Sequence, residues 1–401
     1  MGNTRKLDLF LNKTISTGKI KWKVVDLAYI LCLFVLAFLV RWKLMPIESA
    51  DYFGFLKLWM EEIRETGGFL SLDHQISNYT SPYMYLMCLV SYLTTNDLYG
   101  LKMISIVFDY VAAITMFFLI FQITREKHKA ILGMSILLLC PTVILDSAYW
   151  CQCDIIYTTF ILLALLFFFK DDSRKCLIFI GIAFSFKLQT LFIVPFLIIM
   201  WLKGKTIKLR HFLYIPVIYV ISALPAWLLG RDFKELMGIY FEQSSYYPWG
   251  TLEYPNIYAL LGEAMPDMYH AQEVSGAGVF MLVVVLGVLA YYFYTKKIVL
   301  TNELMVTLAL FTVALTVYIL PHMHDRYGFL VDLLAIVYGV MNGKKIIITC
   351  GFMLVSILTF MPYLIAQHIV PITYIAIGLL ALIVIVGKDL YRQIKEQESS
   401  L

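Results

Sequence analysis

The sequence has few charged residues and no regular alternation of polar and apolar residues. Only 15% of its 401 residues are charged and 61% are hydrophobic, with a mean hydropathy of +0.78. An average soluble domain has about 25% charged residues, so these values exclude that class and indicate an integral membrane protein. Its apolar runs are continuous and do not alternate with a period of two, which predicts a helical bundle and not a barrel.

Other absences exclude further classes. The seven cysteines are an odd number and lie mostly inside apolar runs, so they do not form a disulfide framework. The spacing of Cys151 and Cys153 fits neither a redox motif nor a zinc site. Lysine and arginine gather at the ends of apolar runs and form no basic face, so nucleic acid is not an expected partner. The basic N-terminal segment runs directly into a full-length apolar run, which predicts a retained first helix.

The lengths of the apolar runs predict an all-α, polytopic protein with about twelve transmembrane helices in a single domain, residues 1–401. A span needs about 20 apolar residues. The run 175–202 is too long for one helix and has Lys187 and Gln189 near its centre, so we expect two short helices that meet at Phe186-Lys187-Leu188-Gln189. The run 82–93 is too short to cross and is expected at the interface. The other spans are expected at 24–42, 101–123, 129–147, 155–170, 212–229, 277–295, 303–320, 328–341, 345–366 and 370–387.

The distribution of positive charge predicts the orientation. With these spans, 23 of the 32 lysines and arginines fall on one side, which is therefore expected to be cytoplasmic. Both termini are then expected in the cytoplasm. If 82–93 crossed the membrane, the later segments would invert and the basic segment 125–129 would lie outside.

Two large extracytoplasmic loops follow from this arrangement, at 43–100 and 231–276. In the first, the segment 51–64 has apolar residues at a helical period and predicts an amphipathic helix on the membrane surface, ended by Gly67-Gly68. The second loop is rich in aromatic residues, which could stack on sugars or anchor the chain at the interface. These residues are Tyr240, Phe241, Tyr246, Tyr247, Trp249, Tyr254 and Tyr258.

The segment His322-Met323-His324-Asp325-Arg326-Tyr327 concentrates ionisable groups between two apolar runs. Such groups near membrane depth are costly and by default mark a functional site. Arg326 and His324 offer hydrogen-bond donors to an anion such as a phosphate. Imidazoles and carboxylates are also metal ligands, but the spacing matches no strong metal signature, so no cofactor is expected and a divalent metal is not favoured. The segment could also serve only as an interfacial anchor.

Glu48 and Asp51 lie just beyond the outer end of the first span. A carboxylate in this place is a candidate general base for an acceptor hydroxyl, or simply a solvated loop acid. Asp154 begins an apolar helix, where it could cap the helix, orient an acceptor or hold an ion. Lys187 at the break of its run could meet a phosphate. Lys102 and Asp109 share a helix face and could form an internal ion pair.

These features in this order resemble the GT-C superfamily of polytopic glycosyltransferases that use polyprenyl-phosphate sugars. The resemblance covers about residues 24–330 and is nearest to the endoplasmic-reticulum glucosyltransferases that use dolichyl-phosphate glucose and to their bacterial mannosyltransferase-like relatives. The family's His-Val-His-Glu-Lys tract stands here as His322 to Arg326 with both charges kept, and its Tyr-Pro-Pro tract is reduced to Thr80-Ser81-Pro82-Tyr83. The features are Asp51 with Trp59 and Glu61-Glu62, then Asn78-Tyr79-Thr80-Ser81-Pro82-Tyr83, Trp150-Cys151-Gln152-Cys153-Asp154, Lys187 and His322-Met323-His324-Asp325-Arg326.

The resemblance implies a GT-C fold and an inverting, metal-independent hexosyl transfer on the extracytoplasmic face. The donor would be a polyprenyl-phosphate sugar, with undecaprenyl phosphate as carrier in a bacterial cell membrane, and the acceptor a glycan or lipid-linked glycan of polysaccharide biosynthesis. Asp51 would be the general base. The donor phosphate would be held by His322, His324, Arg326 and Lys187, and the acceptor or the surrounding groups by Glu48, Lys102, Gln152, Asp154 and Asp325.

Two other classes remain open on the sequence. A transporter or flippase of a lipid-linked sugar or anion would use Lys102, Asp109, Lys187 and Arg326 as a charged path, although no internal repeat of the kind seen in many transporters is present. A non-catalytic partner of a polymerase would need none of these residues for chemistry.

Overall fold

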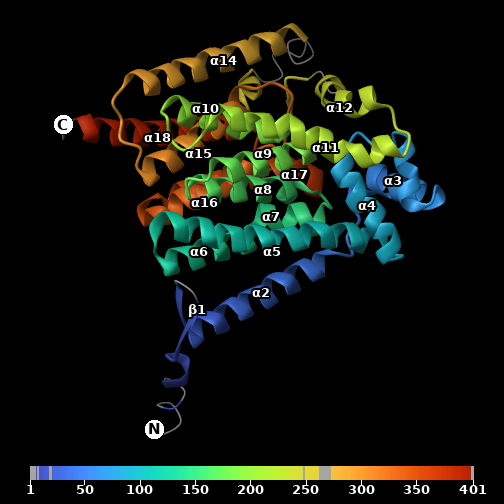
Figure 1. Ribbon diagram of the computed structural model, residues 1–401, viewed down its shortest axis with the longest axis horizontal. Coiled ribbons are helices and arrows are strands. Elements are labelled where there is room, and N and C mark those ends of the chain that lie inside the picture. The colour runs from blue at the N-terminus through green and yellow to red at the C-terminus, as the bar shows by residue number, and fades with distance from the viewer. Residues whose placement is uncertain (1–5, 7–8, 18–19, 247–248, 262–271, 399–401) are drawn as a thin grey trace.

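The computed structural model describes the chain except residues 1–5, 7–8, 18–19, 247–248, 262–271 and 399–401 (Figure 1). Its described part is almost entirely helical and forms a multi-pass membrane protein. Seven helical stretches are long and apolar enough to cross a membrane, and an eighth is obtained if α6 and α7, which are bent by 47° at Cys140, count as one span. The seven are Val24–Leu44 (α2), Asp97–Thr124 (α5), Leu209–Leu228 (α11 with the short turn before it), Ser275–Thr295 (α14), Asn302–Ile319 (α15), Gly343–Ile365 (α17 with the turn before it) and Ile372–Gln397 (α18).

The remaining apolar helices are shorter than a full span, and α8 (Asp154–Phe168) and α16 (Phe329–Met341) among them are almost completely buried. α8 packs against α5 and α9, and it is apolar on all sides because nearly its whole surface is buried. Within the described residues, seven or eight helical stretches are therefore long and apolar enough to cross a membrane. The expectation of twelve crossings requires the shorter helices to cross as well. They are α6 (Lys127–Leu139), α7 (Pro141–Ile144), α8 (Asp154–Phe168), α9 (Ser173–Phe186), α10 (Val194–Leu202) and α16 (Phe329–Met341).

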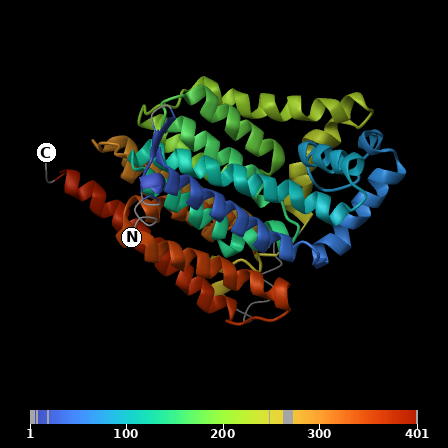
Figure 2. The same ribbon diagram turned by 90° about the horizontal axis from the view of Figure 1, so that it is seen from below.

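The helices run roughly side by side, and the two ends of the bundle differ. The N-terminal hairpin of β1 (Thr14–Thr17) and β2 (Ile20–Lys23) lies at the same end as the end of α18 (Figures 1 and 2). The short helices α3 (Lys57–Glu65), α4 (Ser81–Leu93) and α12 (Phe233–Tyr246) lie at the opposite end. α2 and α14 form the outer edges, and both expose large apolar side chains such as Leu31 and Phe280.

The break expected near the centre of 175–202 is confirmed. α9 ends at Phe186, Lys187 is extended with φ −154° and ψ 136°, and a 3-10 turn (Leu188–Ile193) leads into α10. The hydroxyl of Thr80 donates a hydrogen bond of 3.0 Å to the carbonyl of Phe186, so the first loop supports the break. The Lys187 side chain is thereby placed at the end of a helix and not at the middle of one.

The amphipathic helix expected at 51–64 is present, and one of its faces packs into the protein. A π-helical turn (Tyr52–Leu56) continues into α3, which ends before Gly67 with φ 89°. The buried face consists of Tyr52, Leu56, Met60 and Ile63, whereas Phe55 and Leu58 are exposed. The helix packs on α4 as well as facing outward, because the π-helical turn shifts the register of the residues that follow it.

The second loop contributes a contact that the sequence pattern did not predict. β3 (Thr251–Leu252) pairs in parallel with β4 (Met323–His324), so this loop is tied to the segment that carries the two histidines. The amide of Asp325 also donates a hydrogen bond of 2.9 Å to the carbonyl of Leu252. The orientation of the His322–Tyr327 segment thus depends on a loop about 70 residues earlier in the chain.

Candidate functional site

Four charged residues from separate segments meet near the end of the bundle that carries α3 and α4. Asp51 follows α2, Asp154 is the first residue of α8, Lys187 lies at the break after α9, and Arg326 lies between α15 and α16. Lys187 Nζ is 2.5 Å from Asp154 Oδ1, and Arg326 Nη1 is 3.4 Å from Asp154 Oδ2. Arg326 Nη2 is 3.8 Å from Asp51 Oδ2. The structure therefore brings together the residues that the sequence singled out in four distant motifs.

Asp51 is held by two side-chain donors. The indole nitrogen of Trp150 donates to Asp51 Oδ2 at 3.0 Å, and the amide nitrogen of Gln152 donates to the same oxygen at 2.5 Å. The hydroxyl of Tyr79 donates to Gln152 Oε1 at 3.3 Å, which fixes the direction in which the amide points. Among the described residues no hydrogen bond reaches Asp51 Oδ1, and the side chain is 25% exposed. One carboxylate oxygen is thus restrained while the other is available to a substrate.

Both cations of the site are already engaged by carboxylates. Arg326 contacts Asp51 and Asp154, and its guanidinium lies over the ring of Trp150, 5.1 Å from the centroid. Lys187 pairs with Asp154, which is fully buried. Charged groups removed from water in this way interact more strongly than at a surface, but their net value depends on complete pairing. An anion that binds here has to share these cations with Asp154.

The two histidines occupy different places. His324 stacks at an angle on Tyr327, with ring centroids 5.1 Å apart. Burial, together with the positive charges of Arg326 and Lys187, lowers the pKa of His324 to about 3. His324 is therefore neutral at pH 7, so it can act as a hydrogen-bonding group but not as a cation.

His322 lies away from the charged cluster. Its Nδ1 is 2.6 Å from the carbonyl of Trp249 and its Nε2 is 2.5 Å from the hydroxyl of Ser275. Its backbone has φ 59°, a left-handed conformation that a non-glycine residue rarely adopts. The contacts attach the histidine segment to the second loop and to α14. His322 is thus positioned to hold the segment in place.

Additional carboxyl groups surround the cluster. Asp325 is 3.7 Å from Arg326 Nε, and burial raises the pKa of its carboxyl to about 7, against the lowering effect of Arg326. Asp146 is fully buried, and neither of its oxygens has a hydrogen-bond partner among the described residues. Within the described chain, no three His, Cys, Asp or Glu side chains converge as a metal site would require.

The expected pairing of Lys102 with Asp109 is wrong. Lys102 is fully buried, and its ammonium donates to the carbonyls of Met45 at 3.1 Å and Ile47 at 2.5 Å. Asp109 pairs with Arg41 instead, at 2.7 Å. The helical spacing correctly placed both residues on α5, but a lysine reaches the free carbonyls at the end of α2 more readily than a group seven residues further along its own helix. Lys102 thus fixes the backbone just before Glu48.

Glu48 is exposed and lies in a pocket beside the cluster. The pocket holds about 150 Å³ and is lined by the segment 48–50, by Tyr149 and Trp150, and by Tyr363 and Leu364 at the end of α17. Trp150 is thus both a hydrogen-bond donor to Asp51 and a wall of this pocket. The sequence motifs did not single out Tyr149 or any residue of α17. These residues are of ordinary types for the stretches in which they lie, so nothing in the local sequence marks them.

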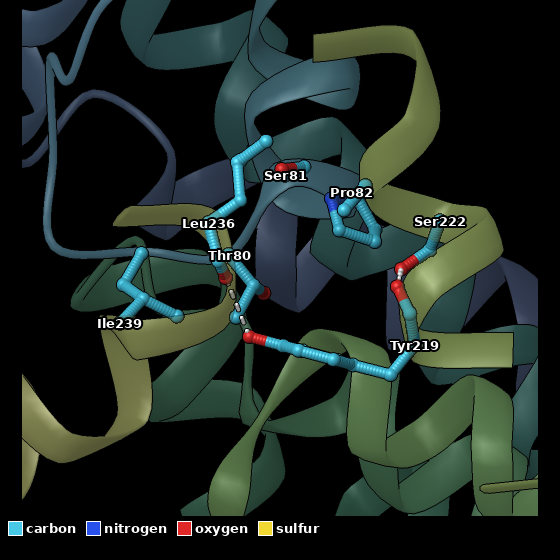
Figure 3. A pocket seen from close by; sticks show the side chains of 8 residues that line it. Thr80, Ser81, Pro82, Tyr219, Ser222, Leu236 and Ile239 are labelled. Carbon is cyan, nitrogen blue, oxygen red and sulfur yellow. Dashed lines mark hydrogen bonds between the residues drawn. The ribbon is translucent and has the colours of Figure 1, made fainter. Parts of the chain in front are cut away.

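The tract Asn78 to Tyr83 lines, with Thr80, Ser81 and Pro82, a second and smaller cavity. Figure 3 shows Thr80, Ser81 and Pro82 facing Tyr219 and Ser222 of α11 and Leu236 and Ile239 of α12. Tyr219 donates a hydrogen bond of 3.0 Å to the carbonyl of Leu236 across it. Its room of about 10 Å³ is close to the minimum for one water molecule. This part of the tract therefore joins α4 to α11 and α12, while Tyr79 alone reaches the charged cluster.

The aromatic residues of the second loop do not form one surface. Tyr240, Tyr254 and Tyr258 are buried, whereas Phe241 is 80% exposed and Trp249 is 44% exposed. Tyr247 lies outside the described residues, as does the side chain of Tyr246. Most of the described aromatic residues thus pack the loop against the bundle, and only the exposed Phe241 and Trp249 are placed for either of the two roles that the sequence left open.

Comparison with known proteins adds no relative. No protein family model matches the sequence, and no curated protein is significantly similar to it. The chemistry of the charged cluster and its pocket therefore carries the functional proposal.

Proposed function

We propose that this protein is an inverting GT-C-type glycosyltransferase that transfers a hexose from a polyprenyl-phosphate donor to a hydroxyl of a glycan or lipid-linked acceptor. The observation that carries the proposal is the hydrogen bonding of Asp51. Its carboxylate is restrained on one oxygen by Trp150 and Gln152, is partly exposed, and lies 3.8 Å from Arg326, which shares Asp154 with Lys187. In the proposed orientation in the cell membrane both termini are cytoplasmic and this site is extracytoplasmic.

In the proposed reaction Asp51 Oδ1 accepts the proton of the acceptor hydroxyl. The hydroxyl oxygen forms a bond to the anomeric carbon of the donor as the bond from that carbon to the phosphate oxygen breaks. The two hydrogen bonds to Oδ2 keep the free oxygen pointed toward the acceptor, because they leave the carboxylate little freedom to rotate. A single carboxylate suffices for such an inverting displacement.

Arg326 and Lys187 stabilise the departing phosphate. Negative charge grows on the phosphate oxygens as the bond breaks, and preorganised cations in a site shielded from water lower the barrier for this step. Both cations face Asp154 in the structure, so the donor phosphate shares them with this carboxylate. Arg326 lies between Asp51 and Asp154, which places a cation within reach of both the base and the leaving group. His324 remains neutral and contributes a hydrogen bond.

The transporter alternative receives no specific support from the contacts. Its charged path would require Lys102 and Asp109 to interact with a moving substrate. Lys102 is bound to backbone carbonyls and Asp109 to Arg41 and Ser147, and all of these groups are buried. These contacts account for both residues as parts of the helix packing.

The test is transfer of radiolabelled sugar from a panel of polyprenyl-phosphate hexoses into a membrane lipid extract, with wild type and Asp51→Asn compared in EDTA. The amide keeps the shape of the side chain but cannot take the acceptor proton, so we expect transfer to fall by about a hundredfold to ten-thousandfold, which is the range that a general base contributes. Unfolding temperature in detergent serves as the folding control.

Three results are possible and each is informative. Transfer by the wild type alone supports the assignment of both donor class and base. Equal transfer by both proteins contradicts the role of Asp51. No transfer by the wild type from any donor contradicts the enzyme assignment, and movement of the labelled lipid across vesicles would then be measured as the test of the transporter alternative.

A further inference from the structure

A pocket beside Asp51 connects the first loop to the C-terminal part of the chain. One wall consists of Glu48 to Ala50, the second of Tyr149 and Trp150, and the third of Tyr363 and Leu364 at the end of α17. It holds about 150 Å³, which is below the roughly 300 Å³ at which sites for drug-sized ligands begin. Its size suits one sugar ring.

The walls of this pocket are held by hydrogen bonds that do not involve a ligand. The hydroxyl of Ser49 donates to the carbonyl of Trp150 at 2.6 Å and accepts from the amide of Tyr52 at 3.1 Å. The hydroxyl of Tyr149 donates to the carbonyl of Leu364 at 3.3 Å and so ties the second wall to the third. The pocket is therefore formed before any substrate binds, which lowers the entropic cost of binding.

The pocket and the proposed base share one side chain. The indole nitrogen of Trp150 donates to Asp51, while its ring packs at 35° against Tyr363 with centroids 5.3 Å apart. Asp51 follows directly after the wall residue Ala50, so the wall of the pocket and the proposed base are joined both through the backbone and through Trp150.

The side chains match the groups of an uncharged sugar. Tyr363 is 45% exposed and presents apolar ring surface, against which the C–H face of a pyranose packs, whereas the ring of Trp150 is buried and supports Tyr363 from behind. Glu48 is an exposed carboxylate that accepts hydrogen bonds from hydroxyl groups. The negative charges of Glu48 and Asp51 disfavour a uronic acid or another anionic ring in the same place.

We propose that this pocket, walled by Glu48, Trp150 and Tyr363, is the acceptor subsite and that it takes the uncharged terminal sugar of the acceptor. This inference rests on the proposed function, and it assigns acceptor specificity to the end of α17, outside every motif of the donor site. Glu48 orients the ring through its hydroxyls, and Tyr363 packs on its face. The hydroxyl that reacts is the one that faces Asp51.

The experiment measures direct binding and transfer on the same purified protein. Binding of methyl hexosides and of the matching methyl glucuronides is followed by saturation-transfer NMR in detergent, with no donor present. We expect the uncharged glycosides to bind at least about tenfold more tightly than the glucuronides. Glu48→Ala and Tyr363→Ala should each weaken binding about tenfold, while Glu48→Gln, which keeps a hydrogen-bond acceptor, should recover affinity for the glucuronides.

Matched controls are exposed residues of the same types elsewhere. Glu65→Ala at the end of α3 and Tyr374→Ala on α18 should leave glycoside binding unchanged. In the transfer assay with methyl hexosides as short acceptors, the two pocket variants should raise the KM for the acceptor and leave the KM for the donor unchanged. A merely structural effect would change both constants or lower the unfolding temperature.

The outcomes separate the pocket from the overall function. Transfer by the wild type, together with unchanged glycoside binding and acceptor KM in both pocket variants, overturns the acceptor subsite and leaves the enzyme assignment standing. Binding that the pocket variants abolish, without transfer from any donor, contradicts the proposed enzyme and leaves a sugar site. Tighter binding of the glucuronides than of the uncharged glycosides overturns the proposed specificity.

Discussion

At the scale of single residues, exposure separates Asp51 from the other carboxylates of the cluster. The Asp51 side chain is 25% exposed, whereas Asp146 and Asp154 are fully buried and Asp325 is 2% exposed. A general base has to exchange its proton with a substrate and then with solvent, and only an accessible carboxylate can do both. Of the buried carboxylates, Asp154 instead compensates the charges of Lys187 and Arg326, and Asp325 contacts Arg326.

Gln152 should affect the rate of transfer more than substrate binding. Replacement of Gln152 with Met keeps the volume but removes the donor to Asp51 Oδ2. A hydrogen bond to a charged group contributes about 1.5–3 kcal/mol, so we expect kcat to fall about tenfold to a hundredfold with little change in KM. The control is Gln397→Met, at the far end of α18. An unchanged kcat would show that the amide does not orient the base.

His324 should lower the free energy of unfolding of the protein in acid. Its pKa is about 3 in the folded protein, below the ordinary value of 6.5, so between these values the unfolded chain binds a proton that the folded protein does not. The free energy of unfolding is therefore unaffected by this group above pH 6.5. It decreases as the pH falls from 6.5 toward 3, because the unfolded chain is protonated first. Asp325, with its raised pKa, acts in the opposite direction. We expect the unfolding temperature of His324→Gln to fall less between pH 7 and pH 5 than that of the wild type.

The same variant tests the charge state of His324 during transfer. Because the imidazole is neutral throughout the range from pH 5 to pH 8, the rate profile of the wild type should show no ionisation of this group there. A step in the wild-type profile that is absent from His324→Gln would contradict this assignment.

At the scale of elements, interruptions of helices place the charged groups. The break between α9 and the turn after it puts Lys187 at a helix end, and the start of α8 puts Asp154 at another. The sequence predicted both positions, because a lysine in the middle of an overlong apolar run and an aspartate at the start of one are local signals. It did not predict that the two side chains pair with each other, since they are 33 residues apart.

Lys102 should stabilise the first loop. In Lys102→Met the side chain keeps its length, but the carbonyls of Met45 and Ile47 lose their donor. Buried carbonyls left without a partner cost about 1–3 kcal/mol each, so we expect a lower unfolding temperature and faster proteolysis within residues 43–100. Proteolysis in detergent with mass-spectrometric mapping of the cuts measures this effect. Equal cleavage of both proteins would show that the loop does not depend on Lys102.

At the scale of the whole molecule, the two ends of the bundle carry different parts of the protein. The end with the hairpin and the end of α18 contains an ion-pair network in which Lys345 contacts both Glu303 and Asp389. The opposite end contains Asp51, Arg326 and the pocket that we propose as the acceptor subsite. This separation matches the skew of positive charge along the sequence, which predicts that the first end is cytoplasmic.

Labelling of introduced cysteines tests the orientation. Glu65→Cys in the first loop should react with a membrane-impermeant maleimide in intact cells, whereas Lys208→Cys should react only after the membrane is opened. Both residues are exposed. Cys32 and Cys350 are exposed as well and are replaced by alanine in both proteins to remove background reaction. Reaction of both sites in intact cells would contradict the predicted topology.

The sequence by itself determined that this is a helical membrane protein, where most of its helices begin and end, and which charged residues lie near helix ends. These properties depend on the local length of apolar runs and on single residues that interrupt them. Only the tertiary structure decided which of those charges meet. It paired Lys187 and Arg326 with Asp154, turned Lys102 and Asp109 to other partners, and placed Trp150 between Asp51 and Tyr363. Such contacts depend on how distant helices pack, and apolar surfaces that look alike in sequence do not specify their neighbours.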